Sequence, residues 1–445
     1  MMANLSRGGR RGAAVALLVA GLVGGCDWFG ESAAPPIPGT RISVLALDRR
    51  IQPDPALAGL RVELPRPVEN REWPQAGGYP NHVMHHLALG DAPKVAWRAS
   101  LGESGGDDRR ILTTPVVAAG MVFAMDSGRR VSAFSAASGN SVWSFDLRPE
   151  GERDGGFGGG VAHADGRLFV ATGWAEVIAL DAASGKALWR TGIAGPVRTA
   201  PTVSGGRVFA VTIDNQLEVL SADDGRKLWN QPAISETAGL MGGASPAVEG
   251  DAVVAAFTSG ELFAMRVENG RVAWQDNLAA VRRIDAISDL ADIRGRPVID
   301  RGSVFAVSHS GRMVAIDLRT GNRIWEQEIG SLESPWVAGD FIYVLTPDSE
   351  VVCLSRGDGR IRWVRPLPRY KREVERKDPL FWTGPVVAGD RVVVVGSNRE
   401  AFSISPYTGE LLGTIQLPDP VYAAPVIAGG TLYVVTDEAS LIALR

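Results

Sequence analysis

A ten-residue motif recurs along this chain and restricts its possible folds more than any other feature of the sequence. Each complete copy has glycine at its sixth position and tryptophan at its tenth. The copies follow one another at intervals of roughly 40–50 residues, a period typical of propellers and repeat arrays. The complete copies are FSAASGNSVW (134–143), LDAASGKALW (180–189), LSADDGRKLW (220–229), MRVENGRVAW (265–274), IDLRTGNRIW (316–325) and LSRGDGRIRW (354–363).

A seventh copy, ISPYTGELLG (404–413), keeps the glycine, but Gly413 stands where the others have tryptophan. Glycine tolerates positive φ angles in tight hairpin loops, so we expect the shared glycine to form a turn between two strands. Tryptophan buries a large apolar surface, and we expect it to fill the space between neighbouring sheets.

A second pattern precedes each motif: a short apolar strand, a glycine-containing turn and a returning strand. One copy, FGGGVAHADGRLFVAT (157–172), has Gly160 where the others have proline. Together with the motif, each repeat supplies four short strands without helical periodicity, which predicts a four-stranded antiparallel meander. The prolines that open the other copies are Pro115, Pro201, Pro246, Pro297, Pro335, Pro385 and Pro425.

The last repeat is incomplete, because the chain ends at residues 441–445, where its tryptophan strand should begin. The missing strand matches KVAW (94–97), ahead of the first full repeat. One blade built from both termini would close the ring and remove exposed sheet edges. The sequence therefore predicts an all-β fold, an eight-bladed β-propeller of four-stranded antiparallel blades over residues 91–445.

The net charge argues against nucleic-acid binding, and the cysteine content argues against a disulfide. The formal net charge is −4, whereas nucleic-acid-binding proteins need a basic face, so we expect no nucleic-acid partner. Cys353 occupies a third-strand position that is alanine in other repeats, which predicts a small buried residue. The only other cysteine is Cys26, so we expect no disulfide.

The N-terminus has the features of an export signal. Arg7, Arg10 and Arg11 precede an apolar run, residues 13–23, which is short for a permanent membrane span and ends near Cys26. Small residues directly before Cys26 resemble a bacterial lipoprotein signal, which predicts a signal peptide over residues 1–25 and a lipid anchor on Cys26. The alternative is an ordinary secretory signal with an incidental cysteine.

Residues 26–90 are predicted to form an N-terminal linker or extension. The segment begins with the proline-rich run AAPPIP (33–38), and residues 59–64 are expected to be a brief strand or irregular cover. His82, His85 and His86 have a spacing that suits a metal site. No acidic or cysteine partner stands nearby, which favours a polar surface segment instead.

The repeats resemble those of PQQ-type propellers, the scaffold of quinoprotein alcohol and glucose dehydrogenases. The resemblance raises the alternative of a periplasmic dehydrogenase that uses PQQ and Ca²⁺. Such enzymes often have adjacent cysteines beside the cofactor, and this chain has none. Its connections are mostly short, and no spacing singles out a catalytic constellation. We therefore expect no catalytic residue, no cofactor and no metal.

A lipoprotein signal followed by eight such blades resembles the BamB family, lipoproteins of the outer-membrane β-barrel assembly (BAM) complex. IDAISDLAD (284–292), leading into RPVI (296–299), is similar to the family's acidic segment before a strand. HSGRMVAIDLRTGNRIW (309–325) is similar to the rest of that blade. The resemblance implies a non-catalytic scaffold that binds a POTRA domain of BamA beside other BAM components. A sheet edge or concave face would be a further site for unfolded barrel clients.

The family contacts BamA through two neighbouring inter-blade loops, and the resemblance places Leu240 and Met241 on one and Asp289 and Asp292 on the other. Loops on a rigid scaffold commonly carry binding residues, and paired carboxylates would select a basic partner. The alternative is that Leu240 and Met241 tuck under the ring while the aspartates only solvate a loop. A PQQ-like lipoprotein with another envelope partner is also open.

The resemblance implies an anchor on the periplasmic face of the outer membrane. Asp27 follows the lipidated cysteine, and in some enteric bacteria this residue favours retention in the inner membrane, so both locations stay open. A basic run at residues 369–377 is expected to be a solvated surface, or else a contact for anionic lipid headgroups or an acidic partner.

Overall fold

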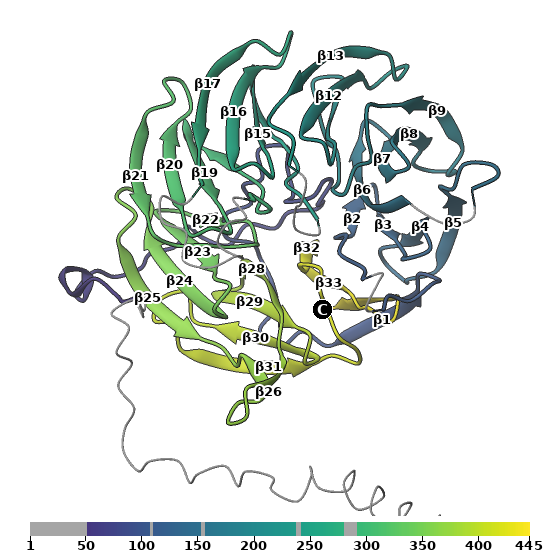
Figure 1. Ribbon diagram of the computed structural model, residues 1–445. Helices are drawn as coiled ribbons and strands as arrows, with labels where there is room; N and C mark the ends of the chain where they lie inside the picture. Colours follow the sequence, from purple (N-terminus) through teal and green to yellow (C-terminus); the bar gives the residue numbers. More distant parts are fainter. Residues whose placement is uncertain (1–50, 107–109, 153–155, 237–241, 280–291) are drawn as a thin grey trace, which may run out of the picture. The chain divides into compact units, whose positions relative to one another are not determined.

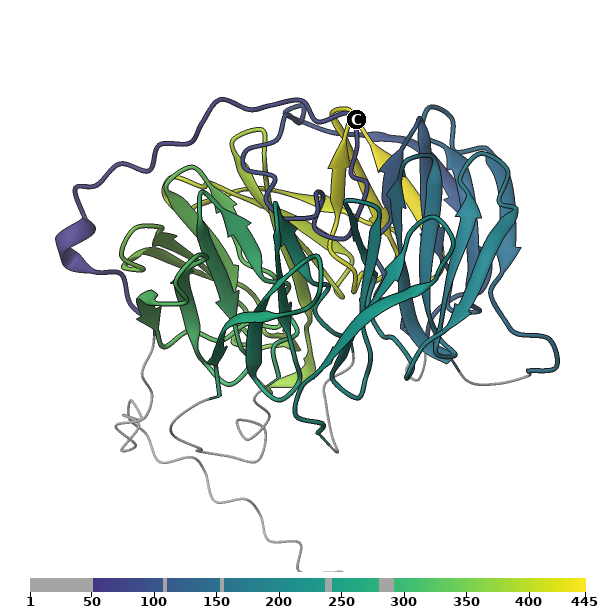
Figure 2. The same ribbon diagram turned by 90° about the horizontal axis from the view of Figure 1, so that it is seen from above.

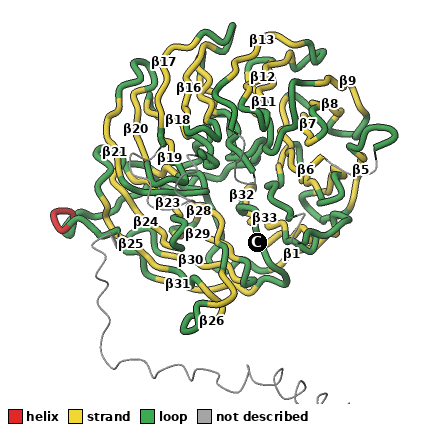
Figure 3. The backbone as a smooth tube through the Cα atoms, viewed as in Figure 1, coloured by secondary structure: helices red, strands yellow, loops and turns green. Residues whose placement is uncertain are grey.

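Eight four-stranded antiparallel sheets follow one another around a ring (Figure 1). The structure is a computed structural model that describes residues 51–106, 110–152, 156–236, 242–279 and 292–445. Residues 51–445 form one compact unit. Within the described ranges the only helical element is the short 3-10 turn η1 (Pro55–Leu57), the red segment of Figure 3. The described residues contain no helix long and apolar enough to span a membrane.

The predicted propeller with eight blades is confirmed, and we number the blades in chain order. Blade 1 comprises β2 (Val116–Ala118), β3 (Met121–Met125), β4 (Arg130–Ser135) and β5 (Ser141–Asp146), and blade 2 comprises β6 (Gly156–Ala164), β7 (Arg167–Gly173), β8 (Glu176–Asp181) and β9 (Ala187–Gly192). Blade 3 comprises β10 (Thr202–Ser204), β11 (Arg207–Val211), β12 (Gln216–Ser221) and β13 (Lys227–Pro232), and blade 4 comprises β14 (Ala247–Glu249), β15 (Ala252–Ala256), β16 (Glu261–Arg266) and β17 (Val272–Asn277).

The remaining blades have the same order of strands, innermost first. Blade 5 comprises β18 (Val298–Asp300), β19 (Ser303–Val307), β20 (Met313–Asp317) and β21 (Arg323–Gln327). Blade 6 comprises β22 (Trp336–Ala338), β23 (Phe341–Leu345), β24 (Glu350–Ser355) and β25 (Ile361–Pro366). Blade 7 comprises β28 (Trp382–Ala388), β29 (Arg391–Gly396), β30 (Glu400–Ile404) and β31 (Leu411–Gln416). Blade 8 comprises β32 (Val426–Ala428), β33 (Thr431–Val435), β34 (Ser440–Leu444) and β1 (Val95–Ser100).

Both chain ends build blade 8, as predicted. Strand β1 pairs antiparallel with β34, from Val95 opposite Leu444 to Ser100 opposite Ser440. The N-terminal strand therefore supplies the outermost position of a sheet whose other three strands come from the C-terminus. This pairing leaves no unfinished sheet in the ring and so removes an edge that other chains would pair with.

The recurring glycine and tryptophan lock neighbouring blades together. Each tryptophan lies on the outer strand of one blade, and its indole nitrogen donates a hydrogen bond to a carbonyl in the hairpin of the next blade. Trp143, for example, donates to the carbonyl oxygen of Ala182 at 2.9 Å. Gly185 in that hairpin has φ +73°, and a Cβ there would lie 2.6 Å from the Trp143 ring. Glycine is thus required both for the turn and for the contact.

The same contact joins seven pairs of blades, and its absence from the eighth pair explains the lost tryptophan. The pairs are Trp97–Gly139, Trp143–Gly185, Trp189–Gly225, Trp229–Gly270, Trp274–Gly321, Trp325–Gly359 and Trp363–Gly409. Blade 8 has no hairpin between β34 and β1, because the chain ends lie there. A tryptophan at Gly413 of blade 7 would have no glycine turn to meet.

Residues 51–90 pack on the propeller and do not form a linker. Asp54 donates its amide to the carbonyl of Ile361 at the outer strand of blade 6, at 2.8 Å. The chain then crosses one face of the ring, where it is the purple trace of Figure 2. Val68 and Ala88 mark the start and end of a closed circuit, because the amide of Ala88 donates to the carbonyl of Val68 at 2.9 Å. We call residues 68–88 the circling segment.

The circling segment contacts the innermost strand region of every blade in turn. Backbone bonds join Trp73 to Val117 of blade 1, with both amide–carbonyl pairs formed at 2.7 and 2.9 Å. Trp73 is 3% exposed and stacks on Trp336 of blade 6 with ring centroids 6.0 Å apart. The other contacts join Asn70 to blade 8, Pro74 to blade 2, Gln75 to blade 3, Pro80 to blade 4, Asn81 to blade 5, His85 to blade 6 and Leu87 to blade 7.

The three clustered histidines belong to this segment, and the expectation of a polar surface segment is wrong for two of them. His82 is 6% exposed, and its Nδ1 lies 2.8 Å from the carbonyl oxygen of Pro297. His86 is 1% exposed and bonds the carbonyl of Pro65 and the amide of Asp390. Partly exposed His85 lies 3.5 Å from Asp300. The rings of His82 and His85 meet blade 5, whereas that of His86 meets blade 7.

Two further expectations concern single elements. Cys353 is fully buried on β24, the third strand of blade 6, as predicted. The basic run at residues 369–377 contributes to a small hairpin, β26 (Tyr370–Arg372) and β27 (Lys377–Pro379), that projects beyond β31 (Figure 1). Its charges pair locally: Arg372 lies 2.8 Å from Asp378, and Arg369 lies 2.7 Å from Asp348.

Candidate functional site

The residues predicted to bind a partner lie on two successive inter-blade connections. Leu240 and Met241 fall between β13 and β14, and Asp289 falls between β17 and β18. These three residues and Cys26 lie outside the described residues. The described ends of both connections show how the ring holds them.

Asp292 is the one predicted site residue that the structure describes. It is 2% exposed, and its carbonyl oxygen accepts a hydrogen bond from the amide of His309 at 2.9 Å. The next residue, Ile293, is also buried and belongs to the apolar core between blades 4 and 5. A buried carboxyl is poorly placed to meet a partner, so Asp292 is better suited to holding the loop end.

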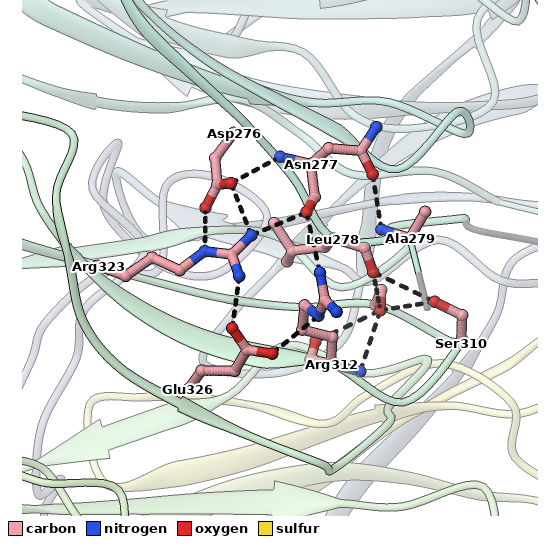
Figure 4. A network of polar contacts seen from close by, with 9 residues as sticks. Asp276, Asn277, Leu278, Ala279, Ser310, Arg312, Arg323 and Glu326 are labelled. Atoms are coloured by element: carbon pink, nitrogen blue, oxygen red, sulfur yellow. Dashed lines mark hydrogen bonds and ion pairs between the residues drawn. The ribbon is translucent and has the colours of Figure 1, made fainter. Parts of the chain in front are cut away.

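A network of charged and polar side chains holds the other end of this connection (Figure 4). The Arg323 guanidinium on β21 binds both carboxylate oxygens of Asp276 at the end of β17, at 2.7 and 2.8 Å. The same guanidinium donates to the backbone carbonyl of Asn277 at 2.9 Å and pairs with Glu326. The hydrogen bonds that Arg323 donates to Asp276 raise the pKa of its guanidinium above the usual value.

The network continues from blade 5 to the last described residues of the connection. Glu326 also pairs with Arg312 at 3.1 Å, and Ser308 and Ser310 donate to the carbonyl of Leu278 at 2.9 and 3.2 Å. Residues 276–279 therefore extend from blade 4 but are fixed by side chains of blade 5 (Figure 4). Such a base holds both ends of the acidic connection to a rigid frame.

The described ends of the two connections lie against each other. A Cβ on Gly242, which follows the first connection, would lie 3.0 Å from the side-chain nitrogen Nε of Arg294, which follows the second. Glu236, Gly242 and Ile293 also line one common cavity of about 390 Å³. The two loops predicted to bind one partner thus begin or end on one stretch of the inner rim.

A second cavity, of about 330 Å³, lies at the centre of the ring, and each of the eight blades contributes to its wall. We call it the axial pocket. Four of its arginines, Arg110, Arg198, Arg294 and Arg296, precede innermost strands. Sequence reasoning missed them, although a signal exists: Arg198 and Arg294 both stand three residues before a strand-opening proline.

The described residues offer little for catalysis or metal binding. No three His, Cys, Asp or Glu side chains among them converge on a point where a metal ion would bind. Burial raises the pKa of the Cys353 thiol far above its usual value, and a protonated thiol is a poor nucleophile. The described part of the site is a rigid base on which the ends of the two inter-blade connections are fixed.

Comparison with known proteins identifies the family. The family model described as outer membrane protein assembly factor BamB matches residues 88–154, 127–365 and 372–445. The chain belongs to the BamB family. The matched ranges include all eight blades and begin at the last residue of the circling segment.

Individual relatives agree with this assignment. The BamB of Yersinia pestis is 29% identical over 304 residues, which cover 67% of this chain and 76% of that protein. The BamB of Escherichia coli is 30% identical over 305 residues, again covering 67% and 76%. The crystal structure of BamB from Moraxella catarrhalis has a TM-score of 0.68 at 19% identity and covers 80% of this chain and 100% of its own.

The same propeller also occurs in enzymes. A quinohemoprotein alcohol dehydrogenase from Pseudomonas putida HK5 has a TM-score of 0.65 at 13% identity and covers 86% of this chain and 83% of its own. A likeness at this level of identity concerns the fold alone, because one scaffold hosts many functions.

Proposed function

We propose that this protein is a lipid-anchored, non-catalytic scaffold that binds BamA and so supports the insertion of β-barrel proteins into the outer membrane. Membership of a family of outer membrane protein assembly factors gives the general role. The observation that carries the specific role is the shared rim: the ends of the two predicted docking loops, at Gly242 and Arg294, are in contact.

The two loops would contribute different terms to docking. Leu240 and Met241 would offer apolar surface, and the methionine would adapt to an imperfectly matched partner. Asp289 would attract a basic surface and speed the encounter. Asp292 and the Arg323–Asp276 pair would hold the acidic loop from its two ends, so that less conformational freedom is lost on binding.

We place the protein on the periplasmic face of the outer membrane, held by lipid on Cys26 after removal of residues 1–25. The short apolar run before Cys26 supports a cleaved signal, and Asp27 keeps inner-membrane retention as the alternative. The outer strands of the blades, such as β13 and β17, would offer edges to unfolded barrel clients by strand addition.

Affinity purification from detergent-solubilised native envelopes tests the docking proposal. A C-terminally tagged chain should recover BamA, and the variant Leu240→Ala/Asp289→Ala should lose most of it. The matched control is Leu188→Ala/Asp223→Ala, which changes the same residue types on exposed outer positions of blades 2 and 3. It should recover BamA like the native chain.

Each other outcome corrects a stated part of the proposal. Equal recovery by both double variants would move the site away from these loops. Absence of BamA from an intact, lipidated native chain would contradict the scaffold role. Reduction of a redox dye by the purified protein supplied with PQQ, Ca²⁺ and an alcohol or glucose as the electron donor would contradict the non-catalytic role. Cys26→Ser should release the protein from membranes and leave BamA recovery in detergent unchanged.

A further inference from the structure

The axial pocket is a blind cavity with a floor that the blades do not supply. Ala76 of the circling segment lines it, and so do residues ahead of the innermost strands of the blades. The circling segment runs over one face of the ring (Figure 2) and bonds to the innermost strand region of every blade. Most residues that line the pocket precede the innermost strands, on the side where connections pass from one blade to the next.

The charged side chains that line this pocket are mainly basic, whereas the chain as a whole has a negative net charge. Among the described residues, five arginines and two carboxylates line it, whereas the chain as a whole carries a net charge of −4. A cleft lined by one sign of charge and walled by protein focuses the electric field and concentrates ions of the opposite sign. The residues are Arg110, Arg129, Arg198, Arg294 and Arg296 against Asp126 and Glu333.

The fold leaves two of these guanidinium groups short of acceptors. Arg198 is exposed, and within the described residues no hydrogen bond or ion pair engages its side chain. The Nε atom of Arg296 is buried and has no hydrogen-bond partner there. Arg294 reaches Glu333 only at 4.0 Å, and that carboxylate also accepts a hydrogen bond from Thr383 at 3.0 Å. Among the described residues, the Nε of Arg296 and the guanidinium of Arg198 therefore remain available as donors.

The circling segment makes room for Arg296. Gly77 has φ +83°, and a Cβ there would lie 3.2 Å from the Arg296 Nε and 2.9 Å from the His82 ring. Burial lowers the pKa of His82 to about 3, so this ring is neutral at the pH of the envelope and does not repel the guanidinium. The floor of the pocket is thus shaped to hold a buried arginine.

We propose that the axial pocket binds an organic polycarboxylate, either a small free molecule or the acidic side chains of a peptide segment. Guanidinium groups match carboxylates with two parallel hydrogen bonds, and the hydroxyl of Thr113 on the wall adds a neutral donor. Leu112, Met125 and Leu332 give the wall an apolar part, which suits an anion on a carbon frame better than an inorganic ion. A cavity of about 330 Å³ fits a ligand of a few carboxylates. This inference does not depend on BamA binding.

Isothermal titration calorimetry of the full-length protein in detergent tests the site with three probes: citrate, a tetraglutamate peptide and inorganic phosphate. Arg198→Gln is the principal variant, because its exposed side chain has no hydrogen bond or ion pair with any described residue whose loss would disturb folding. Arg226→Gln is the matched control, since Arg226 lies in the outer hairpin of the same blade and is also exposed. Thermal unfolding should be unchanged in both variants.

We expect citrate or tetraglutamate to bind, and Arg198→Gln to weaken that binding by about tenfold, the size expected for one charged hydrogen bond. Binding should also weaken with added salt. Tighter binding of tetraglutamate than citrate would identify a peptide segment as the occupant, and the reverse order would identify a free molecule. Arg226→Gln should bind like the native protein.

The proposal is overturned if neither carboxylate probe binds, if phosphate binds as tightly as citrate, or if Arg198→Gln and Arg226→Gln behave alike. Failure here leaves the docking role intact, because Arg198→Gln is expected to recover BamA from envelopes as the native chain does. Loss of BamA with Arg198→Gln, accompanied by loss of tetraglutamate binding, would place an acidic partner segment in the pocket.

Discussion

The two faces of the ring are built in opposite ways. On one face the circling segment bonds to all eight blades and buries Trp73, Gln75 and His82. On the other, open face the connections between blades line the axial pocket, where the Nε of Arg296 has no hydrogen-bond partner among the described residues. The first face is built for stability, and the second keeps polar groups available.

The family comparison sharpens this contrast. The match to the BamB family model begins at residue 88, so most of the circling segment lies ahead of the matched ranges. The sealed face is therefore built by a part of the chain that the family model does not include. Both predicted docking loops, by contrast, lie within the matched ranges.

The largest effect should come from the sealed face. Trp73→Ala removes a buried indole that stacks on Trp336, and such a truncation costs about 3–5 kcal/mol of unfolding free energy. Chemical denaturation followed by tryptophan fluorescence measures the change. The control Leu60→Ala alters an exposed residue of the same extension and should have little effect. Equal stability of the two variants would mean that the segment merely rests on the ring.

Substitutions at the contacts between neighbouring blades should have an intermediate effect on stability. Gly185→Ala places a methyl group 2.6 Å from Trp143 at a positive φ angle, which should cost about 1–3 kcal/mol. Gly413→Ala, at the junction without a tryptophan, meets no atom within 4 Å and should be neutral or slightly stabilising. Differential scanning calorimetry compares them. A similar loss in both would contradict the interlocking role of the glycine turns.

Acid should weaken the sealed face selectively. The pKa of His82 is lowered to about 3 in the fold, so the unfolded chain binds a proton first as the pH falls. Its contribution is complete above pH 6.5 and is lost between pH 6.5 and about 3, by up to about 1.4 kcal/mol per pH unit. His82→Gln stays neutral and should flatten the curve of unfolding free energy against pH. A native curve that parallels the variant's would show that His82 is not the acid-sensitive group.

The smallest effect on stability should come from the open face, where the effect on function is expected to be greater. Arg323→Gln removes a partly exposed pair with Asp276, worth about 1 kcal/mol or less. The loop base would loosen, and BamA recovery from envelopes should fall. Arg360→Gln, which breaks an exposed pair with Asp358 on blade 6, is the control and should leave recovery unchanged. Undiminished recovery of BamA with Arg323→Gln would show that the Arg323–Asp276 network does not contribute to docking.

The repeats made the propeller predictable, and the parts without repeats were not. Strand order and closure follow from the glycine–tryptophan motif and from KVAW (94–97), because each blade repeats one local pattern. The circling segment has no such pattern: it is irregular, and its bonds reach residues as far away as Gly429. Its histidines therefore looked like surface residues, although long-range contacts bury His82 and His86.

For the candidate site, the sequence leaves the docking residues as a prediction and misses much of the surrounding geometry. The segment at 284–292 lies between β17 and β18, but the burial of Asp292 depends on packing between blades 4 and 5 that no local pattern reveals. Two pocket arginines, Arg198 and Arg294, share a spacing to the next proline, yet only ring closure brings them together.

The circling segment also sets an order of events as the chain takes up its structure. It lies near the beginning of the sequence, but its partners extend from Val117 to Gly429. Strand β1 likewise pairs with β34, whose residues are among the last of the chain. During synthesis, the part that emerges early must therefore wait for the part that emerges last. The circling segment can therefore complete its contacts only after all eight blades have formed.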